Sequence, residues 1–123
     1  MLKLFKKNKK SDINYLELIP LAKHSHNIND KGLVDILVPR FKNKQMQWLL
    51  PRHRSPFIRA NLDEFGSEAW LNINGNNTVA NIGINLTEKF GDRINPVYDR
   101  LTLFLTELYK NGFITFKELN ERN

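Results

Sequence analysis

Residues 57–62 have the sequence FIRANL, and residues 63–116 continue as DEFGSEAWLNINGNNTVANIGINLTEKFGDRINPVYDRLTLFLTELYKNGFITF. Apolar residues alternate up to Leu62 and then recur with a helical period of about 3.6. The alternation predicts a strand over Phe57–Leu62 with Ile58, Ala60 and Leu62 on the core side. The change of period at Leu62 predicts that a sheet comes first and that helices follow.

Three helices are predicted after Leu62, because capping and breaking residues flank each apolar stripe. Asp63 is a good N-cap for a helix to about Ile73, and Thr78 caps a second helix that Gly91 ends. Pro96 opens the longest helix, and Asn111-Gly112 ends it. The residues expected to be buried are Ala69, Trp70 and Ile73, then Val79, Ile82, Leu86 and Phe90, then Val97, Leu101, Phe104, Leu105 and Leu108.

Two more strands are predicted upstream. Leu33–Val38 is rich in β-branched residues, and the turn chemistry of Asp30-Lys31-Gly32 makes residues 24–28 its antiparallel partner. A short helical turn is expected through Trp48–Leu50, and residues 15–19 form an apolar patch that packs on the domain. Phe113–Phe116 is expected to add a last short strand.

The fold class predicted from these elements is α+β: a small three-stranded antiparallel sheet followed by a three-helix bundle like a winged helix-turn-helix. One domain is expected over residues 13–123, with strands within about 24–62, helices within about 63–111 and the short strand at 113–116. Residues 1–12 are expected to be a flexible basic arm.

The positive charge of the chain is local rather than general. The formal net charge is +6, but residues 1–10 contain five lysines and no acid, and residues 40–59 contain six basic residues and no acid. The longest predicted helix has Arg100 and Lys110 against Asp99 and Glu107, which makes it neutral. A winged helix that binds DNA needs basic or amide side chains on that helix, so a nucleic-acid partner is the alternative and not the preferred interpretation.

The chain offers little for catalysis or metal binding. It contains no cysteine, and its serines lie outside nucleophile motifs. His24 and His26 have a spacing that metals can use, but no third ligand is near in sequence, so ordinary exposed histidines are expected. We therefore predict a protein that is not an enzyme and needs no cofactor or metal. No apolar run is long enough to span a bilayer and no secretory signal is present, so a soluble, cytoplasmic protein is expected.

An open sheet edge suggests a different activity. A three-stranded sheet has two edges, and an edge can accept a partner strand by β-augmentation. The competing interpretation is an edge covered by Arg59 or by the N-terminal segment. Leu103 is expected to point away from the buried stripe, either as a single exposed leucine or as part of a contact surface.

The stretch Phe57–Phe116 resembles the PqqD family, which includes coenzyme PQQ synthesis protein D. The resemblance is carried by Asn61-Leu-Asp63, Ala69-Trp70, Asn74-Gly75, Thr78-Val79 with Ile82, Leu86 and Phe90, Val97-Tyr98-Asp99, Leu105, Leu108 and Gly112-Phe-Ile114. The chain differs in having Asn74 where many members have Asp, and in its lysine-rich arm and basic 40–59 segment.

This resemblance implies a RiPP recognition element, a non-catalytic module that binds the leader of a ribosomally synthesised precursor peptide and presents it to a modifying enzyme such as a radical SAM protein. The leader would add as a strand between the third strand and the third helix. The peptide-binding residues implied are Phe57, Ile58, Arg59, Ala60 and Asn61 on the strand, and Tyr98, Leu101, Thr102 and Leu105 on the helix. Self-association of two copies through the same edge is a further option.

Overall fold

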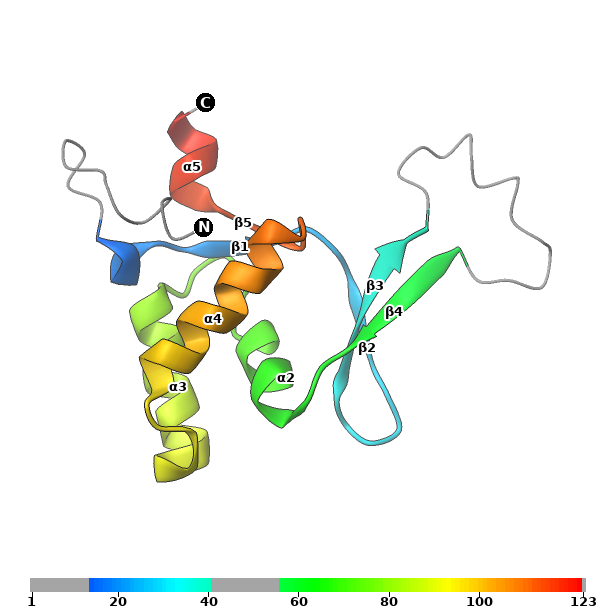
Figure 1. Ribbon diagram of the computed structural model, residues 1–123. Helices are drawn as coiled ribbons and strands as arrows, with labels where there is room; N and C mark the ends of the chain where they lie inside the picture. The colour runs from blue at the N-terminus through cyan, green and yellow to red at the C-terminus, as the bar shows by residue number, and fades with distance from the viewer. Residues whose placement is uncertain (1–13, 41–55, 123) are drawn as a thin grey trace.

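The computed structural model describes residues 14–40 and 56–122 (Figure 1). The predicted arm at 1–12 and the predicted turn at Trp48–Leu50 lie outside these ranges. The elements are, in order, η1 (Tyr15–Glu17), β1 (Pro20–Ala22), β2 (His26–Ile28), β3 (Val34–Pro39), β4 (Phe57–Asn61), α2 (Glu64–Leu71), α3 (Val79–Phe90), η3 (Gly91–Ile94), α4 (Val97–Lys110), β5 (Ile114–Phe116) and α5 (Lys117–Arg122).

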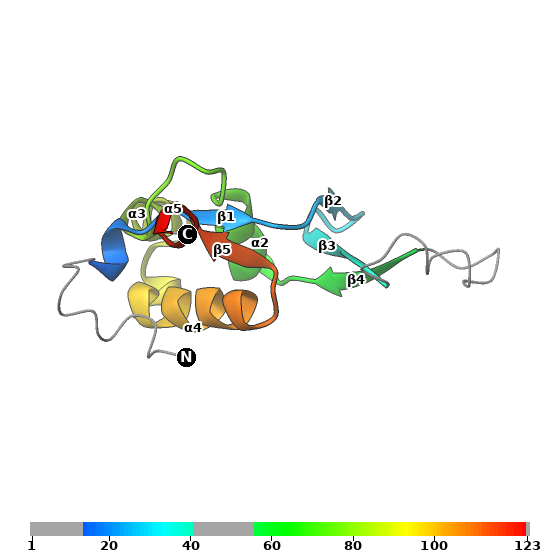
Figure 2. The same ribbon diagram turned by 90° about the horizontal axis from the view of Figure 1, so that it is seen from above.

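The predicted fold class is confirmed: a small antiparallel sheet precedes the helices. Its strand order is β2-β3-β4, with His26 opposite Ile36 on one side and Ala60 opposite Ile36 on the other. Val34 and Ile36 of the central strand are fully buried. Figure 2 shows the sheet beside the helices, with the far ends of β3 and β4 extending away from them.

The structure also contains a second, two-stranded sheet that joins the two ends of the described chain. Pro20 of β1 lies opposite Phe116 of β5, and Ala22 lies opposite Ile114. The backbone N–H of Lys23 extends this ladder by donating to the carbonyl of Phe113 at 2.9 Å. The sequence predicted β5 but not its partner, because the two strands are far apart in sequence. The structure adds α5, which was not predicted.

The helices begin and end where the local signals placed them, to within two residues. The side chain of Asp63 accepts from the N–H of Gly66 at 2.8 Å, and that of Thr78 accepts from the N–H of Asn81 at 3.1 Å. Gly91 stops α3 with a φ of 64°, a conformation that favours glycine. These contacts satisfy backbone groups that helix ends otherwise leave unpaired.

One core lies between the helices, the central strand β3 and the β1-β5 pair. The predicted buried stripes of the three helices are buried as expected, except that Phe104 is only half-buried. Ile58 is the main correction in the sheet, because 49% of it is exposed although it was expected on the core side. Its strand extends past the helices, so none of the described helices covers the far end of that face (Figure 2).

Candidate functional site

Among the described strands, β4 forms one edge of the three-stranded sheet, and its hydrogen-bond register shows which of its backbone groups face outward. Leu62 donates its N–H to the carbonyl of Val34, and Arg40 donates to the carbonyl of Pro56, each at 2.9 Å. In an antiparallel ladder such bonded pairs recur at every second residue, so Ile58 and Ala60 also pair with β3. The N–H and C=O groups of Arg59 and Asn61 therefore point away from β3, toward the open side of the sheet.

The side chains of these two outward residues turn back over the outer face of the sheet. Asn61 Nδ2 donates to Asp35 Oδ1 at 2.6 Å, and Arg59 Nη1 lies 3.8 Å from Asp35 Oδ2. Asn29 Nδ2 donates to the same Asp35 oxygen at 3.0 Å. Since Asp35 lies on the central strand, it draws both edge side chains toward β3. This arrangement leaves the outward backbone groups of Arg59 and Asn61 uncovered by their own side chains.

Apolar side chains lie at both ends of the edge. Phe57 is 37% exposed and Ile58 is 49% exposed at the beginning of β4. At its other end, the Cβ of Leu62 and the ring of Phe104 both lie close to Gly66 of α2: a side chain on Gly66 would meet Leu62 Cβ at 3.4 Å and Phe104 Cε1 at 3.2 Å. The end of β4, the beginning of α2 and the middle of α4 therefore meet at one place.

The four residues of α4 expected to bind peptide lie in the core or on the flank of the helix away from Phe104. Leu101 and Leu105 are buried in the core, with exposures of 0% and 1%. Tyr98 packs against α3, where its hydroxyl donates to the carbonyl of Ala80 at 3.0 Å. Thr102 lies near Tyr15, and burial raises the pKa of that tyrosine.

The flank of α4 nearest to the end of β4 is the one opposite Tyr98 and Thr102. The guanidinium carbon of Arg100 lies 4.7 Å from the ring centre of Phe65 in α2, and the rings of Phe65 and Phe104 meet edge to face at 6.3 Å. Sequence could have indicated Arg100 and Phe104 as a pair, because they are one helical turn apart beside the buried stripe. Periodicity alone treats both flanks alike, so only packing shows which one faces the strand.

The two histidines that were considered as metal ligands have separate surroundings. His26 Nδ1 accepts from Trp70 Nε1 at 3.1 Å. His24 lies outside β2, and its ring meets that of Phe113 at 5.2 Å. Burial, with a smaller effect of the Lys23 charge, lowers the pKa of His24. Within residues 14–40 and 56–122, no group of three His, Asp or Glu side chains is placed to hold a metal ion.

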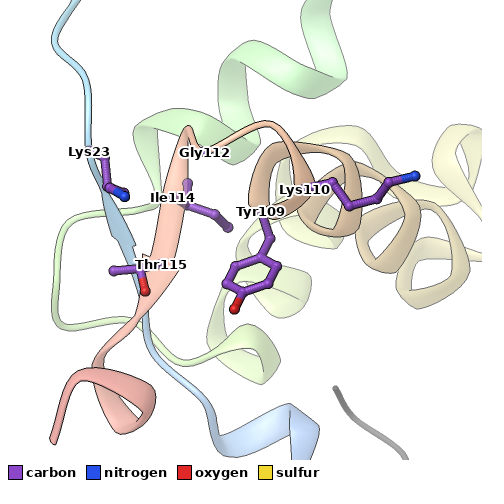
Figure 3. A pocket seen from close by; sticks show the side chains of 6 residues that line it. All are labelled: Lys23, Tyr109, Lys110, Gly112, Ile114 and Thr115. Atoms are coloured by element: carbon purple, nitrogen blue, oxygen red, sulfur yellow. The ribbon is translucent and has the colours of Figure 1, made fainter. Parts of the chain in front are cut away.

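A shallow hollow of about 370 Å³ lies between the end of α4 and β5 (Figure 3). It is lined by Lys23, Tyr109, Lys110, Gly112, Ile114 and Thr115. Figure 3 shows the side chain of Lys110 extending away from the other residues, so the two lysines do not converge on a common point. Nζ of Lys110 instead lies 3.8 Å from a carboxylate oxygen of Glu107. This hollow offers no concentrated charge to a ligand.

Comparisons with known proteins return no relative for this chain. No protein-family model matches it, and neither a curated protein nor a solved structure does. In the part of the chain that the structure describes, no helix combines the length and apolar character needed to cross a bilayer.

Proposed function

We propose that the protein is a non-catalytic peptide-binding module that accepts an extended peptide as an additional strand along β4. The observation that carries this proposal is the outward-facing backbone of Arg59 and Asn61 on an edge strand that ends beside Leu62 and Phe104. An added strand would pair with the outward N–H and C=O groups, and its side chains would contact the apolar residues at either end.

The main chain alone gives only part of the binding energy. Two outward residues can form four hydrogen bonds, and each contributes a net value of about 0.5–1.5 kcal/mol. The total of about 2–6 kcal/mol must also offset the loss of translational and rotational freedom, which costs at least about 4 kcal/mol. Side-chain contacts at Ile58, Leu62 and Phe104 are therefore needed for useful affinity, and they would select the peptide sequence.

The resemblance to the PqqD family supports a particular kind of peptide. We propose that the ligand is the leader of a ribosomally made precursor, and that the module presents it to a modifying enzyme, of the radical SAM type in the PQQ pathway. The open edge belongs to the third strand of the sheet, which is the position where that family adds its leader. The helix side of the surface would consist of Arg100 and Phe104 rather than Tyr98 and Leu101.

The structure favours a peptide over nucleic acid as the ligand. α4 carries two basic residues, Arg100 and Lys110, and Lys110 lies beside Glu107. Two such residues also supply few phosphate contacts, and nucleic-acid binding depends on many. A short DNA duplex is therefore expected not to compete with a bound peptide.

The test begins with a selection of displayed random peptides on the purified protein, followed by calorimetric titration of a selected synthetic peptide. Arg59→Pro removes an N–H that faces the open edge, where proline is tolerated in a sheet. We expect it to weaken binding about tenfold, because one hydrogen bond is lost and the proline ring obstructs the next. Arg59→Ala keeps the N–H and is the matched control, with affinity close to that of the wild type.

A second measurement reports the geometry directly. Hydrogen exchange of the complex should show new protection at the amides of Arg59 and Asn61, while those of Ile58 and Ala60, already paired with β3, change little. A folded Arg59→Pro variant that binds as tightly as the wild type, or unchanged exchange at both outward amides, would refute strand addition. Sedimentation of the free protein at several concentrations shows whether a second copy occupies the edge instead.

A further inference from the structure

A second hollow, which we call the arginine pocket, lies where the beginning of α2 meets η3 and α4. Its volume is about 330 Å³, roughly ten times the ~30 Å³ that one water occupies in the liquid. The pocket is lined by Asp63, Glu64, Phe65, Phe90, Arg93, Ile94 and Arg100. It is therefore large enough for the end of a polar side chain together with a few waters.

Two guanidinium groups in this pocket are each held against an aromatic ring. The guanidinium carbon of Arg93 lies 5.1 Å from the ring centre of Phe90, and that of Arg100 lies 4.7 Å from the ring centre of Phe65. Such contacts orient the guanidinium and leave its N–H groups available to an acceptor. A planar carboxylate is the acceptor that fits a guanidinium best, because two parallel hydrogen bonds can form.

The two acidic residues of the pocket leave most of the guanidinium N–H groups of Arg93 and Arg100 available as donors. Asp63 uses one carboxylate oxygen to accept from the N–H of Gly66. Glu64 lies 3.9 Å from Arg93, but both side chains are largely exposed, so the pair is weak. Among the described residues, Arg100 has no carboxylate partner. Two arginines against two carboxylates suit an incoming group with one negative charge better than a doubly charged phosphate.

The arginine pocket lies just beyond the C-terminal end of β4. Asp63, one of its lining residues, follows Asn61 by two positions, and Phe65 touches both Arg100 and Phe104. In Figure 1, β4 runs toward the beginning of α2, with α3 and α4 beyond it. A peptide that pairs with Arg59 and Asn61 and continues in the same direction would pass the junction of Leu62 and Phe104 and then meet the arginine pocket.

We propose that the arginine pocket binds the carboxylate of an aspartate or glutamate side chain in the peptide held along β4. This inference rests on the proposed function and adds a sequence preference to it: an acidic residue beyond the segment that forms the added strand. Arg100 and Arg93 supply the donors, and the rings of Phe65 and Phe90 hold them in place. The acidic residue would fix the position of the peptide along the edge, which backbone pairing alone leaves undetermined.

The test repeats the displayed-peptide selection with the wild type and with the double variant Arg93→Gln/Arg100→Gln. We expect acidic residues to be enriched at one fixed distance from the apolar positions with the wild type, and this enrichment to disappear with the double variant. Lys110→Gln removes one charge from the same helix outside the pocket and is the control, which should keep the enrichment. Circular dichroism and urea unfolding verify that each variant is folded.

A thermodynamic cycle then measures the contact itself. Changing the acidic residue of a selected peptide to its amide should weaken binding about threefold to tenfold with the wild type and hardly at all with Arg100→Gln. Equal losses with both proteins would overturn the inference, as would peptides that require only a free C-terminal carboxylate, shown by comparison with amidated peptides. If the amides of Arg59 and Asn61 become protected but the peptide change costs the same affinity with both proteins, the pocket proposal is wrong and strand addition stands. If these amides do not become protected, the proposed function itself is wrong.

Discussion

The close packing of Tyr98 on α3 gives a sharp test of the fold through Gly83→Ala. Alanine in the interior of a helix is normally more stable than glycine by about 1 kcal/mol. At Gly83, however, a Cβ would overlap the Tyr98 ring and would lie 2.6 Å from its hydroxyl oxygen. The ring cannot simply swing away, because its hydroxyl donates to the carbonyl of Ala80 in the same helix.

The expected change in the free energy of unfolding follows from these opposing effects. Overpacking a well-filled site costs about 1–3 kcal/mol, and losing the Tyr98 hydrogen bond adds about 1 kcal/mol. After the gain of about 1 kcal/mol in helix propensity, Gly83→Ala should lower the free energy of unfolding by about 1–3 kcal/mol. The measurement is equilibrium unfolding in urea, followed by tryptophan fluorescence and circular dichroism, with the m-value compared between variants.

A double-mutant cycle separates the overlap from any general effect of the substitution. In a Tyr98→Ala background the ring is absent, so Gly83→Ala should become stabilising by up to about 1 kcal/mol. Asn81→Gly and Asn81→Ala, made at an exposed position of α3, measure the helix propensity difference without a neighbouring ring. If Gly83→Ala were as stable as the wild type at an unchanged m-value, the packing of Tyr98 against α3 would be refuted.

Two further predictions concern the small sheet and its surroundings. Asp35→Ala removes the acceptor shared by two asparagine side chains and should lower the free energy of unfolding by about 1–3 kcal/mol, whereas Asp30→Ala in the adjacent exposed turn should change it by less than about 0.5 kcal/mol. A more stable Asp35→Ala variant in the same urea assay would contradict this. Burial, with a smaller effect of Lys23, lowers the pKa of His24 below its ordinary value of 6.5, so the folded state binds this proton less readily than the unfolded state. Stability should therefore be full above about pH 6.5 and fall as the pH drops below it, and His24→Gln should reduce that fall; an unchanged pH profile in this variant would exclude His24 as its cause.

The parts of the fold that could be predicted depend on interactions between residues near each other in sequence. Asp63 and Thr78 cap helices because each side chain reaches an N–H three residues ahead, and Gly91 stops α3 through its own φ. The pairing of β2 with β3 was predictable for a related reason: a short turn connects the two strands, and alternation marks the second of them. Such signals are present in any short window of the chain.

The exposure of side chains on the edge strand β4 cannot be predicted from the alternation of apolar residues alone. Ile58 and Ala60 lie on the same face of β4, yet only Ala60 is packed against the core. The difference is that the helices cover one end of that face and not the other. A sequence pattern of period two states which face a residue occupies, but not how far the opposing layer extends.

The sequence by itself determined the class of the fold, the helix ends, the buried stripes and the presence of a third strand before the helices. Only the tertiary structure decided that β1 pairs with β5, which flank of α4 faces β4, and that Arg93 and Arg100 share a pocket. These features join residues from distant segments, and their positions follow from the packing of whole elements rather than from local propensity. For this reason the edge strand of the candidate site could be located from the sequence, whereas the side chains of α4 that lie beside its end, Arg100 and Phe104, could not.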